Sequence, residues 1–145
     1  VVPFAGHQAT LAGLREALAG KVVVDAVVPM EFRDGSPRAI WVEEGSAAEQ
    51  AQALLPQSSV VGAFHHLSAR KLRSAAALDA DCLVAGDDDA AKAIVFDLVR
   101  EIAALRPLDA GGLSGAYQVE LFTAALLNIN RRYKTQASVR IVGVE

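Results

Sequence analysis

The chain has 145 residues, which is enough for one domain with its own hydrophobic core and too few for a second full domain. Its 14 basic and 17 acidic residues give a net charge of −3 at pH 7, so it lacks the basic surface expected of a nucleic-acid-binding protein. Hydrophobic residues make up 52% and charged residues 21%, which excludes a disordered chain, and polar residues interrupt the most apolar segment, 116–129, well short of the roughly 20 residues that a membrane-spanning helix needs.

The first four residues, VVPF, are predicted to be the end of a buried strand, because they are apolar and no polar segment or turn precedes them. A native domain rarely begins inside its own sheet, so we expect the chain to be a fragment that lacks its N-terminal part. Residues 7–19 then have leucines three and four positions apart, which predicts a helix, and Gly20 occupies a position typical of a helix C-cap.

Strand and helix patterns alternate along the rest of the chain. Residues 21–28 are a nearly continuous β-branched run, which is typical of a strand covered on both faces in a parallel sheet. The alternation predicts an α/β domain with a doubly wound parallel sheet. The remaining predicted elements are a polar loop or short hairpin at 31–45, a helix at 45–55, strands at 59–65 and 81–85, a helix at 90–105, an extended segment at 106–112 and a last helix at 113–132. The apolar face predicted for the helix at 90–105 consists of Ile94, Leu98, Ile102 and Leu105, which are three or four positions apart.

The last predicted helix has apolar residues around most of its circumference, among them Tyr117, Phe122 and Ile129. One face would pack on the sheet, and a single monomer rarely supplies enough apolar surface to cover the other. We therefore expect this helix to contact a second subunit and the protein to be a homodimer.

Two adjacent histidines, His65 and His66, are the most conspicuous candidates for a metal site. Neighbouring residues of a strand point to opposite faces, and no cysteine or further histidine lies at ligand spacing, so we predict no metal site. His65 keeps functional interest because ligands of open α/β sheets bind at the carboxyl ends of the strands. The ligand-binding edge predicted on this basis includes Pro3, Pro29 and His65.

Two charged clusters each have a structural and a functional interpretation. The acidic run 87–89 precedes a predicted helix, where acidic side chains cap free N–H groups, and we prefer this interpretation to a catalytic cluster. The basic cluster could bind the anionic tail of a ligand or form a solvated surface, and the two interpretations are equally good. It consists of Arg70, Lys71 and Arg73, together with Arg33 and Arg38.

No side chain is predicted to be catalytic. The chain contains no nucleophile elbow, no G-x-G-x-x-G motif and no P-loop, and Cys82 lies in the middle of a predicted strand as a small buried hydrophobe. A single cysteine also excludes an intramolecular disulfide. Because no signal peptide is visible either, we expect a cytoplasmic protein.

Seven motifs, in order over essentially the whole chain, resemble those of the NADPH-dependent reductases of coenzyme F-420, a hydride carrier with an 8-hydroxy-5-deazaflavin ring. The motifs are VPF at 2–4, VVV at 22–24 continuing to VVP at 27–29, SAAE at 46–49, VVGAFH at 60–65, GDDD at 86–89, RPLDAG at 106–111 with LS at 113–114, and LLNI at 126–129.

This resemblance implies a Rossmann-like domain followed by a small helical C-terminal extension. Residues 1–110 would be a partial NADP-binding domain that lacks its first three strands and the Gly-rich phosphate loop, and residues 111–145 would be the C-terminal helix and tail. The implied reaction is direct hydride transfer between NADPH and coenzyme F-420, with the chemistry carried by the cofactors. Without the phosphate loop, the 145-residue chain alone is expected to bind NADPH very weakly and to be inactive.

The resemblance also implies which residues contact the two cofactors. They lie at the nicotinamide edge, in the loop after a strand end, and in the C-terminal tail, which would approach the deazaflavin. Two alternatives stay open, namely another Rossmann reductase acting on an imine or hydroxy acid, and a non-catalytic interaction or oligomerisation module. The implied contact residues are Val2, Pro3, Gly6, Val28, Pro29, His65, Leu67, Ala69 and Ser138.

Overall fold

The computed structural model describes residues 2–74 and 77–144. Its centre is a four-stranded sheet in the order β1-β4-β5-β6. Two of the three strand pairings are parallel, β1 with β4 and β5 with β6, as the doubly wound prediction requires. The strands are β1 (Val22–Asp25), β4 (Ser59–Gly62), β5 (Ala80–Gly86) and β6 (Leu105–Asp109).

The prediction of a wholly parallel sheet is wrong at one pairing, because β4 and β5 are antiparallel. A parallel connection needs a crossover helix that packs back on the sheet. The described part of the connection between β4 and β5 contains only the short helix α3 (Ala69–Leu72), so the chain turns back and β5 runs in the opposite direction.

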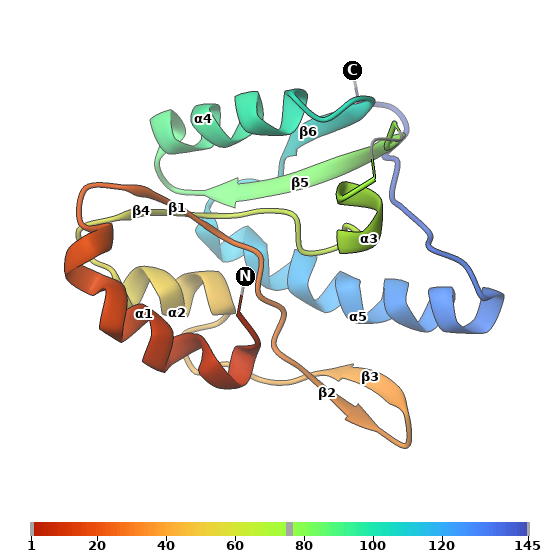
Figure 1. Ribbon diagram of the computed structural model, residues 1–145, viewed down its shortest axis with the longest axis horizontal. Coiled ribbons are helices and arrows are strands. Elements are labelled where there is room, and N and C mark those ends of the chain that lie inside the picture. The colour runs from red at the N-terminus through yellow and green to blue at the C-terminus, as the bar shows by residue number, and fades with distance from the viewer. Residues whose placement is uncertain (1, 75–76, 145) are drawn as a thin grey trace.

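Helices cover both faces of the sheet (Figure 1). Helix α4 lies on one face, against a core that includes Val61, Cys82 and Val84. The opposite face, which includes Val60 and Ala85, packs against helices at both ends of the chain. These side chains alternate between faces along each strand, as the pleat requires. The helices are α1 (Phe4–Leu18), α2 (Ala47–Leu54), α4 (Asp89–Arg100), the 3₁₀ turn η1 (Leu113–Gly115) and α5 (Ala116–Tyr133).

The chain start differs from the prediction of a strand end. Val1 lies outside the described residues, Val2 and Pro3 are in no strand, and α1 already begins at Phe4. Pro3 has φ of −62°, which suits the residue that leads into a helix. The apolar sequence of this segment does not distinguish a strand from a helix, because a helix start and a strand end of four residues look alike in sequence.

Helix α4 begins as predicted and turns a different face to the sheet. Asp88 caps it by accepting hydrogen bonds from the N–H groups of Ala90 and Ala91. Ile94 and Leu98, predicted as part of the apolar face, are 58% and 51% exposed. The buried residues are smaller, namely Ala91, Val95 and Val99, because the helix lies close to Ala80 and Cys82 on the sheet.

The polar insert after β1 is a hairpin, one of the two predicted forms. Its strands are β2 (Met30–Arg33) and β3 (Ser36–Ala39), paired antiparallel. Asp34 and Gly35 both have positive φ, which is the backbone of a tight two-residue hairpin turn. The hairpin lies against the C-terminal half of α5, where Arg131 donates a hydrogen bond to the Gly35 carbonyl.

Gly115, at the junction of η1 and α5, has no room for a side chain. A Cβ there would lie 2.4 Å from the carbonyl oxygen of Ala110, a backbone atom that cannot move aside cheaply. We expect Gly115→Ala to lower the free energy of unfolding by about 1–3 kcal/mol, measured by urea denaturation. Gly13→Ala is the control, because nothing lies within 4 Å of its Cβ position and alanine favours the helix. Equal effects of the two substitutions would contradict this account.

Candidate functional site

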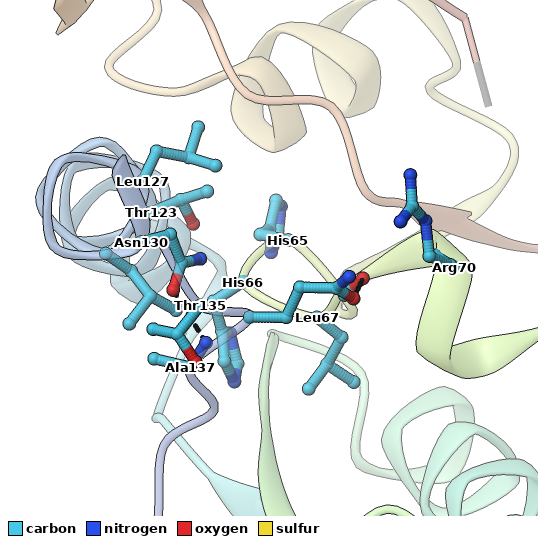
Figure 2. Close-up of a pocket in the computed structure, with 12 residues that line it drawn as sticks. His65, His66, Leu67, Arg70, Thr123, Leu127, Asn130, Thr135 and Ala137 are labelled. Carbon is cyan, nitrogen blue, oxygen red and sulfur yellow. Dashed lines mark hydrogen bonds between the residues drawn. The ribbon is translucent and has the colours of Figure 1, made fainter. Parts of the chain in front are cut away.

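A cavity of about 360 Å³ lies beyond the carboxyl end of β4. Its walls are the loop that follows β4, one face of α5 and the start of the C-terminal tail, which we define as residues 134–144 (Figure 2). Leu67 and Leu127 make part of the lining apolar, while Thr123, Asn130 and Thr135 add hydroxyl and amide groups. A cavity with both kinds of group suits a ring system with polar edges.

His65 is buried in the loop that forms one wall of the cavity. Neither of its ring nitrogens has a hydrogen-bond partner among the described residues. The nearest acidic atom is Oε1 of Glu120, 3.9 Å from Nε2, which is too far for a hydrogen bond. Burial lowers the pKa of His65 to about 4, so the imidazole is neutral near pH 7. A buried neutral imidazole without partners can offer a donor and an acceptor to a ligand that reaches it.

His66 points away from His65 (Figure 2). Its Nε2 lies 2.9 Å from the backbone oxygen of Asp81, so this nitrogen donates and the Nε2–H tautomer is required. Its Nδ1 is buried and has no partner among the described residues. No cluster of three His, Cys, Asp or Glu side chains within residues 2–74 and 77–144 is placed to hold a metal ion.

Glu120 is a functional candidate that the sequence did not single out. It projects from the buried face of α5, and its carboxylate accepts hydrogen bonds from the N–H groups of Ala47 and Ala48 at 3.1 and 3.3 Å. These are free donors of the first turn of α2, where the helix dipole favours an anion. Burial outweighs this stabilisation and raises the pKa of Glu120 to about 7. The only sequence signal was a lone acid within an apolar helix.

A second buried polar network involves His7 on α1. His7 Nε2 lies 2.7 Å from Oδ2 of Asp25, the last residue of β1, and Nδ1 lies 3.0 Å from Oε1 of Gln50. The Gln50 amide nitrogen donates to Glu44, so its oxygen faces His7 as an acceptor. Both ring nitrogens of His7 therefore donate, which requires the imidazolium. Burial lowers the pKa of His7, but the bonds to Asp25 and Gln50 outweigh it and the net shift is upward.

Two of the nine implied contact residues, His65 and Leu67, line the main cavity. Val28 and His65 follow parallel neighbouring strands, so they lie at the same edge of the sheet. Pro29 lies beside Glu120 in a separate small pocket under the hairpin. Ser138, in the tail, accepts a hydrogen bond from Lys71 Nζ at 3.2 Å.

The other four implied contacts lie outside the main cavity. Val2 and Pro3 precede α1, and Gly6 lies within it, where the nearest atom to a Cβ would be Thr10 Oγ1. Ala69 is the first residue of α3.

In the basic cluster, Arg70 lines the cavity and Arg33 pairs with Glu31 on the hairpin.

Cys82 is fully buried, and burial raises the pKa of its thiol to about 11, in agreement with its prediction as a small core residue. Among the described helices, none is both long enough and apolar enough to cross a bilayer.

Comparison with known proteins gives a consistent result. No model of a protein family matches the chain. The chain is 34% identical to an F420-dependent NADP reductase of Methanocaldococcus jannaschii over 148 residues, which is 99% of the chain. A protein of the same name from Methanothermobacter marburgensis is also 34% identical, over 149 residues. The chain spans 66% of the length of each, just under two thirds.

A solved structure supports the relationship. It is described as a putative F420-dependent NADP reductase from Arthrobacter sp. FB24, and it superposes with a TM-score of 0.87 at 27% identity. The superposition covers 98% of this chain and 67% of that one. This structure and the relatives that match almost every residue of the chain have the same description. The chain belongs to the family of F420-dependent NADP reductases.

Proposed function

We propose that this chain is part of an oxidoreductase that transfers a hydride between NADPH and coenzyme F-420. The observation that carries the proposal is the 34% identity to F420-dependent NADP reductases over 99% of the chain. The names of these relatives favour neither alternative from the sequence, the reductase of imines or hydroxy acids and the non-catalytic module.

The cavity beside His65 fits one of the two cofactor rings. A planar ring would pack against Leu67 and Leu127, while the polar groups of Thr123 and Asn130 lie within the same lining. The unpartnered ring nitrogens of His65 would gain hydrogen bonds from a polar ring edge, which would offset their burial. We therefore assign this cavity to the deazaflavin and keep Val28 and Pro29, at the same edge of the sheet, for the nicotinamide.

Nicotinamide and deazaflavin, when bound, supply the hydride chemistry themselves. The chain contributes orientation and exclusion of water, and no side chain needs to act as nucleophile or base. The loop at His65 and the face of α5 would fix one ring between them. Neutral His65 would donate or accept a hydrogen bond without adding charge to the cavity.

Filling the cavity tests this assignment. Leu67→Trp should weaken binding of coenzyme F-420 by about tenfold or more, because the larger ring occupies the proposed binding space. Ile94→Trp on α4, at an exposed position that does not line the cavity, is the matched control and should bind normally. Binding is measured by fluorescence titration of the full-length protein, and reduction by the loss of visible absorbance of F-420 on adding NADPH.

The two parts of the proposal fail in different ways. If the wild-type protein does not reduce coenzyme F-420 with NADPH, the proposed function is wrong. If it does, and Leu67→Trp binds as well as Ile94→Trp, only the location of the site is wrong.

We further propose that the protein acts in the cytoplasm as a homodimer formed through α5. Apolar side chains remain exposed along this helix although its other face is buried, as expected for a helix with a second contact. They are Leu121, Phe122, Ile129 and Tyr133. The free, buried thiol of Cys82 suits a reducing compartment.

Phe122→Asp is expected to dissociate the dimer and leave the folded monomer nearly as stable, because Phe122 is 39% exposed in the single chain. Sedimentation velocity measures the dissociation, and thermal unfolding measures the stability. Leu98→Asp on α4, also half exposed, is the control and should not change the sedimentation coefficient. A wild-type protein that sediments as a monomer at all accessible concentrations would rule out the dimer.

A further inference from the structure

Asp81, near the start of β5, is a buried charged residue outside the cavity that forms hydrogen bonds with several other segments. Its side chain is fully buried, and Arg106 on β6 donates two hydrogen bonds to its carboxylate. Nε donates to Oδ1 at 2.8 Å and Nη2 to Oδ2 at 3.0 Å. Oδ2 also accepts from the backbone N–H of Ile141 in the tail. These bonds, those from Arg106 first among them, hold the pKa of Asp81 below its usual range, so the carboxylate is charged at neutral pH.

The backbone of Asp81 joins two further segments. Its N–H donates to the carbonyl of Val139 in the tail at 2.7 Å, and its carbonyl accepts from Nε2 of His66 at 2.9 Å. Arg106 adds a hydrogen bond to the carbonyl of Ile141 at 2.8 Å. One residue thus fixes the tail, through Val139 and Ile141, and the loop after β4, through His66.

Both of these segments are walls of the main cavity. His66 and Leu67 line it from the loop, while Gln136 and Ala137 line it from the tail. The two walls also meet directly, since Ser68 Oγ donates to Oε1 of Gln136 at 3.0 Å. Both walls are therefore hydrogen-bonded to Asp81, which does not itself line the cavity.

We infer that Asp81 and Arg106 are positioning residues, which set the width of the cavity by fixing the tail and the His66 loop to the same strand. This inference rests on the proposed function only in taking coenzyme F-420 as the occupant. A merely structural ion pair would change the stability of the fold. A positioning pair must in addition change the affinity for the occupant and leave the turnover of the bound complex nearly intact.

Arg106→Lys tests the inference, because lysine keeps the positive charge but lacks the planar guanidinium that donates two hydrogen bonds to Asp81. We expect faster hydrogen exchange at the amides of both Ile141 and Leu67, and a KM for coenzyme F-420 raised about tenfold with kcat changed less than about twofold. Arg100→Lys, which alters an exposed ion pair on α4, is the matched control and should change none of these quantities. Thermal unfolding verifies that each variant is folded.

Each result decides the inference. Faster exchange at Ile141 alone, or at both amides with an unchanged KM, would show that the pair is only structural. If Arg106→Lys does not fold, the exchange and affinity readouts pass to Asp81→Asn, which keeps the shape of the side chain. If the wild-type protein does not reduce coenzyme F-420, the proposed function fails, and the exchange at Leu67 still shows whether the two walls are coupled through Arg106.

Discussion

His7→Leu is expected to lower the free energy of unfolding by about 3–5 kcal/mol, because it leaves the buried carboxylate of Asp25 without its ionic partner. The remaining described side-chain bond to Asp25 comes from the backbone N–H of Val27. Urea denaturation measures the loss. Since small domains are stable by only about 5–15 kcal/mol, the variant should also unfold at a much lower temperature.

The raised pKa of His7 makes the free energy of unfolding depend on pH. The imidazolium is favoured in the folded protein, so its contribution to stability is complete below the ordinary value of 6.5 and is lost as the pH rises through the pKa of the folded state. His7→Leu should remove this loss.

Two controls isolate the cause. Leu14→Ala on the exposed face of α1 should cost less than about 1 kcal/mol. The double variant His7→Leu/Asp25→Leu removes both charges and should be more stable than His7→Leu alone. If the single variant costs no more than Leu14→Ala, the pair does not hold α1 to β1.

Glu120→Gln is expected to remove the part of the pH dependence of stability that comes from the Glu120 carboxyl, whose ionisation destabilises the folded protein as the pH rises. The unfolded carboxyl ionises near 4.5, whereas burial raises the pKa in the folded protein to about 7. Between these values this carboxyl releases a proton on unfolding, so its contribution to the free energy of unfolding falls by up to about 3 kcal/mol from pH 4.5 to above pH 7. The glutamine variant keeps an oxygen that can accept from Ala47 or Ala48 and has no proton to lose.

Urea denaturation at pH 5 and pH 8 measures this effect. The two proteins should be similar at pH 5, and Glu120→Gln should be the more stable at pH 8. Glu101→Gln, at the exposed end of α4, should retain the wild-type slope. A difference in free energy of unfolding between Glu120→Gln and the wild-type protein that is the same at pH 5 and pH 8 would contradict the assignment to Glu120.

The sequence was informative where a pattern depends on neighbouring residues. The acidic run before α4 predicted a cap, and Asp88 provides it, because capping needs only the next few backbone N–H groups. The β-branched run predicted β1, although the strand ends at Asp25, where the side chain of Asp25 accepts from Val27 and the chain leaves the sheet.

It was less informative where distant segments decide the outcome. Periodicity cannot tell which face of α4 meets the sheet, and Ile94, on the apolar face that the spacing predicts, is largely exposed. His7 and Asp25 are far apart in sequence, and Glu120 meets α2 only in the folded chain, so neither network could be predicted. The antiparallel pairing of β5 with β4 is likewise a long-range contact that periodicity does not reveal.

Isotope transfer tests the central claim most directly. The full-length protein is incubated with coenzyme F-420 and NADPH that carries deuterium at C4 of the nicotinamide, prepared separately for each face of the ring. We predict that one of the two labelled forms delivers its deuterium to C5 of the reduced deazaflavin, detected by mass spectrometry and proton NMR, with no hydrogen from solvent at that position. Direct hydride transfer by this protein would be contradicted by absence of F-420 reduction. It would also be contradicted if the hydrogen added at C5 came only from solvent.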